Sequence, residues 1–298
     1  MWLELQIFGF RALWSPFFFL MVVLCGLFYH FLFFRKFKTK EKPTIKQQIS
    51  FYIGLLLLYI AKGSPVDLLS HITLTAHMIQ MATFLLLVPI LFIKGLPAWV
   101  WEKILLAPKI KPIVQLLTKP VIALLFFNGL FSFYHLPLLF NFSKETPVAH
   151  FTIHAALFFA AFIMWLPLMA PVKEINKLKP LLKIVYIFVN SVLITPACAM
   201  IIFAPDPLYE AYMETGAWIT ALSLCVPNDV LQGISGVLTG PDLFSPLGIR
   251  EDQQLGGIVM KLVQEFIYGT VLVMIIRQWF KEENRPVDPL PSNSYHSS

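Results

Sequence analysis

Histidine and methionine recur at helical spacings in two apolar stretches of this sequence. His150 and His154 are four residues apart, as are His77 and Met81, so each pair would lie on one face of a helix. Imidazole binds copper, zinc, iron and nickel, whereas a thioether is a soft donor that suits copper best. A set with both kinds of side chain therefore favours a copper site, with Cu(I) as the favoured oxidation state.

The elements that would hold these side chains are those of a membrane protein. Of the 298 residues, 57% are hydrophobic and 13% are charged, and the mean hydropathy is +0.72. Soluble domains carry about 25% charged residues. The apolar residues form long runs and do not alternate with polar ones, which excludes an outer-membrane β-barrel and favours membrane-spanning helices.

We expect residues 1–283 to form one all-α, polytopic bundle with about seven transmembrane helices. The predicted spans are 15–34, 48–68, 73–93, 120–142, 148–170, 184–204 and 252–279. The long loop 205–251 is acidic. Its apolar segment 217–239 is interrupted by Pro227, so we expect a re-entrant or surface helix there. Residues 284–298, rich in proline and serine, are expected to form a disordered cytoplasmic tail.

Lysine and arginine predict the orientation, because cytoplasmic loops of membrane proteins collect them. Most of the 23 follow the first, third, fifth or seventh span, and the first of these connections, 35–46, holds six. The N-terminus is therefore expected outside the cell and the C-terminus in the cytoplasm. The exceptions near the outer side are Arg11, Lys62, Lys144 and Arg250.

With this orientation, five of the seven histidines fall toward the outer side of the membrane. Polar groups at membrane depth are costly and usually functional. We therefore expect a copper site in the outer leaflet, with capture residues nearer the surface. The candidate ligands are His77, Met78, Met81, His135, His150 and His154, and the candidate capture residues are His71 and Met213. The alternative is that these histidines form hydrogen bonds that stabilise the bundle.

The last span carries a second polar set. Lys261 and Glu265 are one turn apart and would form an ion pair that orients the helix, or part of a polar path or docking surface. Asp252, at the outer mouth of this span, is a candidate for the same role. Gly256 and Gly257 would permit a close approach between helices.

No sequence motif indicates an enzyme. The sequence lacks HExxH, P-loop, GxGxxG and GxSxG motifs. Its three cysteines, Cys25, Cys198 and Cys225, are far apart and form no CxxC, which predicts neither a disulfide framework nor a thiolate metal site. The basic loops lie where the orientation requires them, so we expect no nucleic acid as a partner.

Five segments resemble the CtaG proteins, which assist assembly of caa-type cytochrome c oxidase in Gram-positive bacteria. The matching segments are MWLELQIFGF at 1–10, AHMIQM at 76–81, HLP at 135–137, WLPL at 165–168 and DQQLGG at 252–257. The resemblance covers roughly residues 10–280. Many relatives have a histidine at the position of Met81, so this chain offers a softer ligand set.

The resemblance implies a multi-pass protein of the bacterial plasma membrane that is needed for an active oxidase. Its partners would be oxidase subunits, above all the largest, whose copper centre beside the haem it would help to build as a metallochaperone. Two other functions stay open: a metal-free scaffold for oxidase assembly, and a haem-binding membrane protein in which paired histidines ligate the iron. A transporter is less attractive, because no inverted repeat is evident.

Overall fold

The computed structural model describes residues 2–33, 42–234, 238 and 240–284. These residues form helices and no strand, which confirms the all-α class. The expected disordered tail lies, apart from Asn284, outside the described residues.

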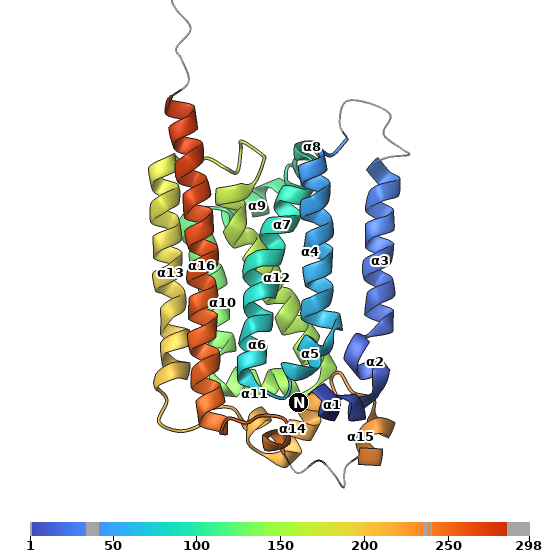
Figure 1. Ribbon diagram of the computed structural model, residues 1–298. Helices are drawn as coiled ribbons and strands as arrows, with labels where there is room; N and C mark the ends of the chain where they lie inside the picture. Colours follow the sequence, from blue (N-terminus) through green and yellow to red (C-terminus); the bar gives the residue numbers. More distant parts are fainter. Residues whose placement is uncertain (1, 34–41, 235–237, 239, 285–298) are drawn as a thin grey trace, which may run out of the picture.

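Long helices run roughly side by side through the bundle (Figure 1). They are α3 (Pro16–Phe31), α4 (Ile45–Gly63), the continuous run of α6 (Leu74–Met81), η3 (Ala82–Leu87) and α7 (Val88–Gly95), and then α10 (Pro120–Tyr134), α12 (Pro147–Met169), α13 (Pro180–Phe203) and α16 (Ile249–Glu283). The segment η3 is a π-helical turn, which widens the helix directly after Met81.

Shorter helices lie at the two ends of the bundle. They are α1 (Trp2–Leu5), η1 (Gln6–Phe8), α2 (Gly9–Trp14), α5 (Pro65–Leu69), α8 (Ala98–Leu105), α9 (Lys111–Leu117), α11 (Pro137–Glu145), η4 (Glu210–Tyr212), α14 (Thr215–Leu222), α15 (Asn228–Ile234) and η5 (Pro241–Leu243). The expected re-entrant or surface segment is thus two short helices, α14 and α15, at one end of the bundle (Figure 1).

By length and apolarity, five helical segments among the described residues can cross a membrane. A sixth is α9 with α10, if these two helices, bent by 76°, count as one span. The helix α4 falls outside this set, since Lys46 and two glutamines near its start and Lys62 near its end make it less apolar, yet it runs beside α3 and α7 (Figure 1). The protein is therefore a multi-span membrane protein, and the count of seven spans stays a prediction.

The expected fourth span, 120–142, is wrong as a single helix. The helix α10 ends at Tyr134, and α11 begins at Pro137 and lies across the end of the bundle (Figure 1). Pro137 has no N–H to donate, and a residue that precedes proline avoids the helical conformation. Leu136 accordingly is extended, with ψ 136°.

The basic connections lie at one end of the bundle, and the starts of α6 and α12, which carry candidate histidines, lie toward the other end (Figure 1). We call the end formed by 42–46, 94–119, 170–183 and 277–284 the basic end, and the end formed by 64–73, 135–150, 205–234 and 240–249 the histidine end. The N-terminal helix α1 lies at the histidine end, and α16 finishes at the basic end (Figure 1). Which end faces the cytoplasm stays a prediction from the basic residues.

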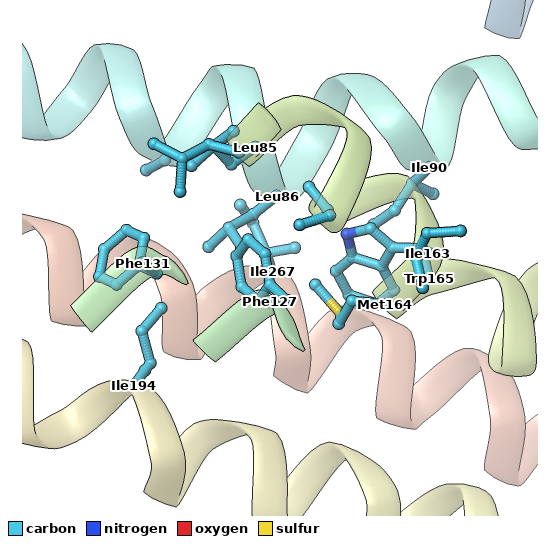
Figure 2. Packing of buried hydrophobic residues seen from close by; sticks show 14 of the residues in the cluster. Leu85, Leu86, Ile90, Phe127, Phe131, Ile163, Met164, Trp165, Ile194 and Ile267 are labelled. Carbon is cyan, nitrogen blue, oxygen red and sulfur yellow. The ribbon is translucent and has the colours of Figure 1, made fainter. Parts of the chain in front are cut away.

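Apolar side chains from α6 to α16 fill the middle of the bundle. Figure 2 shows Leu86, Phe127, Phe131, Trp165, Ile194 and Ile267 converging there from different helices. Two glycines bring α16 close to its neighbours: a Cβ on Gly256 would lie 3.1 Å from backbone atoms of Leu74, and one on Gly257 would lie 2.7 Å from Ile202. The expected close helix approach is therefore present.

Candidate functional site

Helix caps fix the segments that carry the histidines. Thr73 caps α6, because its hydroxyl accepts a hydrogen bond from the Ala76 N–H at 3.3 Å. Thr146 caps α12 in the same way, with Ala149 as the donor at 3.2 Å. A capping hydroxyl satisfies an N–H that the helix itself leaves without a partner, so each helix begins at a defined residue a few positions before its histidine.

Five histidines form one cluster at the histidine end. The ring centres are 6.3 Å apart for His77 and His135, and 6.4 Å apart for His77 and His154. The centre of the His150 ring lies 4.0 Å from that of His154 and 5.3 Å from that of His71. These histidines, which we expected to lie at one side of the membrane, thus lie close together in the structure. We call His71, His77, His135, His150 and His154 the histidine cluster.

A directed hydrogen-bond chain through the cluster joins four helices: α4, α12, α10 and α6. The Lys62 ammonium lies 2.8 Å from His154 Nδ1, and the Tyr134 hydroxyl lies 3.1 Å from His154 Nε2 and 3.4 Å from His77 Nε2. An ammonium group can only donate. His154 therefore accepts at Nδ1 and donates from Nε2 to Tyr134, whose hydroxyl donates to His77 Nε2. This assignment leaves the proton of neutral His77 on Nδ1.

The Lys62 ammonium is held by two further side chains. It lies 3.8 Å from Asp67 Oδ1 and 3.4 Å from Gln80 Oε1. The Gln80 amide donates to Asp67 Oδ1 and to the Ala61 carbonyl, each at 2.6 Å. These bonds link α4, α5 and α6 and fix the position of the cation that faces the histidine cluster.

A second buried lysine contacts the cluster from α11. The Lys144 ammonium lies 3.3 Å from His71 Nδ1, and it lies over the rings of Phe140 and Tyr212. Burial, and then the charge of Lys62, lowers the pKa of Lys144 to about 7. Burial, followed by the charge of Lys144, holds the pKa of His71 well below its ordinary value. His71 is therefore a neutral imidazole that accepts from Lys144.

Three buried imidazole nitrogens in the cluster have no hydrogen-bond partner: His77 Nδ1, His135 Nε2 and His150 Nδ1. His135 Nδ1 lies 2.7 Å from the Phe131 carbonyl and must donate to it, so Nε2 of the neutral ring carries a free lone pair. A donor bond from one ring nitrogen to a carbonyl is the arrangement that orients metal-binding histidines. His135 Nε2 is therefore the nitrogen best prepared to bind a metal.

The methionines occupy different surroundings. Met78 and Met81 are completely buried and belong to the main hydrophobic cluster that fills the bundle. Met213 directly follows η4 and is half-buried. The contacts of Met78 and Met81 are those of core packing, and their role as ligands stays a prediction.

Within the described part of the chain, no three His, Cys, Asp or Glu side chains are close enough to hold one metal ion. The histidine cluster is thus not a closed four-ligand cage of the kind that structural zinc sites use. A site of two ligands, or one that rearranges when it is loaded, agrees with this geometry.

A second cluster of buried apolar residues lies at this end of the bundle, and we call it the cover. The cover comprises Leu5, Phe8, Ala12, Leu13, Leu68, Ile72, Trp218, Leu222, Val226, Leu231, Leu238 and Phe244. Beside it, Tyr209 and Tyr212 donate to the carbonyls of His135 and Ser70, at 2.8 and 2.7 Å. A cleft of about 440 Å³ along the cover is lined by Arg11, Lys62, Asp67 and Cys225, so it connects the surface with Lys62.

Sequence reasoning did not assign Lys62, Lys144, Tyr134, Asp67 or Gln80 to the site. A signal for the two lysines was present, since both are exceptions to the rule that basic residues gather on one side of the membrane. A cation on the wrong side needs a local partner, and the histidine nitrogens supply one. No comparable signal in the sequence marks Tyr134.

The polar residues of α16 have separate roles in the structure. Asp252 accepts hydrogen bonds from the Leu74 N–H at 2.6 Å and the Thr75 N–H at 3.4 Å, so it anchors the start of α6. Lys261 and Glu265 form the expected ion pair at 2.7 Å. The side chain of Glu265 is 51% exposed on the face where α16 packs against α13.

Replacing Asp252 by alanine should destabilise the protein by about 1–3 kcal/mol, because the buried N–H of Leu74 and the part-buried N–H of Thr75 lose their acceptor. Asp252→Asn keeps one acceptor oxygen and should cost less. Thermal unfolding in detergent measures both, with Asp206→Ala as the control, since Asp206 lies exposed in the loop. Equal midpoints for Asp252→Ala and Asp206→Ala would contradict the anchoring role.

Comparison with known families gives a match over most of the chain. The family model described as cytochrome c oxidase caa3 assembly factor (Caa3_CtaG) matches residues 13–282. No match was found among curated proteins or among solved structures.

Proposed function

We propose that this chain, which belongs to the family of cytochrome c oxidase caa3 assembly factors, captures copper at its histidine end and passes it to the largest oxidase subunit. Family membership makes cytochrome c oxidase the partner and assembly the role. The copper cargo, the receiving subunit, the absence of catalysis and the location in the bacterial plasma membrane, with the histidine end outside, are the proposed parts.

One observation carries the copper proposal: His135 presents a buried, unpartnered Nε2 while its Nδ1 is held by a carbonyl. A buried polar atom without a partner is costly, and a metal ion would relieve that cost. Burial among aromatic rings also suits a soft ion such as Cu(I), which needs less hydration than Cu(II) or zinc.

His77 is the natural second ligand. Metal–nitrogen bonds of about 2.0–2.1 Å place the centres of two imidazoles on one ion roughly 5–6.5 Å apart. The rings of His77 and His135 are 6.3 Å apart, within that range. His77 would have to release its Nδ1 proton to solvent when the metal binds. Nε2 would take up a proton from Tyr134, Tyr134 one from His154 Nε2, and His154 Nδ1 one from Lys62, so the ring would stay neutral. His150, with its own free Nδ1, is the third candidate.

A two- or three-ligand site suits an ion that must be handed on. Fewer ligands than a closed cage leave a coordination position for a ligand from the receiving protein, so transfer can proceed by exchange. The cleft beside Lys62 provides the entry. Asp67, in the same cleft, offers a carboxylate to an arriving cation.

Docking on the oxidase would use the exposed part of the α16 ion pair. Charged side chains that face lipid near the middle of a span are costly, and Glu265 is half-exposed in the middle of the 35-residue α16. A polar side chain on a transmembrane helix of the oxidase could donate a hydrogen bond to the exposed part of this carboxylate.

Changing Lys261 and Glu265 together to leucine should weaken co-purification with the oxidase by about three- to twentyfold, the range for one interhelical hydrogen bond. Cu(I) binding should be unchanged. The matched control is the double change Lys281→Leu and Glu283→Leu, which removes the same charges from the end of the same helix. Undiminished co-purification would exclude this face as the docking surface.

The primary test is metal content and Cu(I) titration of detergent-purified protein. The wild type is compared with a variant in which His77, His150 and His154 are all alanine. We expect about one Cu(I) per chain in the wild type and a large loss in the variant. Wild-type protein that binds no copper would overturn the proposal, and a Soret absorption band in the same sample would favour the haem-binding alternative.

A metal-free scaffold is the second candidate function. It is favoured by the two lysines, because Lys62 and Lys144 already occupy nitrogens of His154 and His71. In that case the histidines serve to bury cations at the end of the bundle. A copper-binding-deficient variant that still restores oxidase assembly in cells would support the scaffold.

A further inference from the structure

The basic end contains a cavity that the proposed function does not use. It has a volume of about 630 Å³ and lies between the ends of α7 and α12, the connection 170–178, the start of α13 and the last turns of α16. These parts of the helices lie toward the end of the bundle opposite to the histidine end (Figure 1).

Three lysines line this cavity against one glutamate. They are Lys94, Lys173 and Lys183, and the acid is Glu282. Lys94 donates to the thioether sulfur of Met274 at 3.3 Å, which is a weak acceptor. Glu282 accepts from the Gln278 amide at 2.9 Å. The cavity therefore presents an excess of positive charge that its own acid does not balance.

The start of α13 adds to the attraction for an anion. Pro180 is the first residue of this 24-residue helix and lines the cavity, and no side chain caps the helix there. The first N–H groups of an uncapped helix point outward, and the helix dipole favours negative charge at this end. The lysines and the helix start thus favour the same kind of ligand, a phosphate.

Two features indicate that this phosphate belongs to a lipid. Leu181 and Leu182, next to the cavity, are exposed apolar side chains at the end of a membrane-spanning helix, where acyl chains would contact them. Trp279 lines the cavity, and tryptophan is typical of the headgroup level of a membrane. Basic pockets between transmembrane helices are known to bind anionic headgroups.

Asn176 belongs to the wall of the cavity. It donates from Nδ2 to the Ala170 carbonyl at 3.1 Å, which holds the connection after α12 in place. The excess of lysines favours a headgroup with a net negative charge over a zwitterionic one. We propose that the cavity binds an anionic phospholipid, with the phosphate on the lysines.

Native mass spectrometry of the whole detergent-purified protein tests this proposal. Phosphatidylglycerol and phosphatidylcholine with identical acyl chains are offered together. The wild type should retain phosphatidylglycerol preferentially. Each lysine replaced by glutamine should reduce that preference on the order of fivefold, so the triple variant Lys94→Gln, Lys173→Gln, Lys183→Gln should lose it.

The control variant is Lys109→Gln, Lys111→Gln, Lys119→Gln, which removes the same charge from exposed positions at the same end. It should keep the wild-type preference. Lys94 is half-buried in α7, so its replacement could disturb that helix. The lipid preference is therefore also measured for the double variant Lys173→Gln, Lys183→Gln, which leaves α7 unchanged. Equal retention of both lipids by the wild type, or an unchanged preference in the triple and double variants, overturns the proposal.

A second experiment, with inorganic phosphate, distinguishes a lipid ligand from a soluble anion. Inorganic phosphate should stabilise the wild type against thermal unfolding far less than phosphatidylglycerol does, because it cannot contact the apolar rim at Leu181. Equal stabilisation by the two would make the cavity a site for soluble phosphate and overturn its assignment to a lipid.

Discussion

Replacing His77 and His135 together by alanine is expected to reduce the affinity for Cu(I) by about a hundredfold or more. Loss of a single supporting contact to a metal-binding histidine already costs 10–100-fold, and this change removes both members of the closest pair with unpartnered nitrogens. Competition with a coloured Cu(I) chelator measures the affinity. Activity of the caa3 oxidase in cells that carry the variant should fall in parallel.

The single variants rank the two ligands. His135 has its lone pair free in the neutral ring, whereas His77 must first lose the Nδ1 proton, so His135→Ala should weaken binding more than His77→Ala. His30→Ala is the matched control, since His30 is exposed on α3 and outside the histidine cluster. Wild-type affinity in the double variant, with normal unfolding behaviour, would falsify the assignment of these two ligands.

Gly256→Leu should destabilise the protein by about 1–3 kcal/mol or more. Its Cβ would lie 3.1 Å from the Leu74 carbonyl group and from the Thr75 nitrogen. These are backbone atoms that cannot rotate away, and overpacking of a dense core costs energy in this range. The same displacement would stretch the bonds from Leu74 and Thr75 to Asp252, so α6 would lose its anchor.

Gly269→Leu is the control for this change. Gly269 lies in the same helix, and no atom of another residue lies within 4 Å of the position its Cβ would take. Thermal unfolding should therefore separate the two variants clearly, and Gly256→Leu should also bind Cu(I) more weakly, since His77 is three residues from Leu74. If both leucine variants unfold at the same temperature, the contact between α16 and α6 does not limit stability.

The sequence predicted the helical class, because apolar runs of membrane-spanning length leave few other folds. The gathering of the histidines was also predictable. His150 and His154 share a helix face by spacing alone, and the depth of His77 and His135 followed from the ends of their runs. The spacing of the histidines and the distribution of basic residues were therefore sufficient to predict that the histidines lie toward the same end of the bundle.

The rest depended on information that spacing does not contain. Their spacing places His77 and Met81 on one helix face. Spacing does not predict which neighbouring residues pack against that face, and in the structure Met81 packs in the main hydrophobic cluster. Prolines are common inside membrane helices, so the sequence alone does not distinguish a continuous span 120–142 from the break that the structure has before Pro137. The bond of Tyr134 to two histidines joins residues 57 and 20 positions apart, so only the packed bundle brings them together.

The cover sets an order of events during synthesis of the protein. It is made of residues near the N-terminus, such as Leu5 and Phe8, and of residues late in the chain, such as Trp218 and Phe244. The histidines at 71–154 leave the ribosome well before this second part exists. The residues of the histidine cluster are therefore all synthesised before the late part of their cover, and the complete cover requires the chain to have been made at least as far as Phe244.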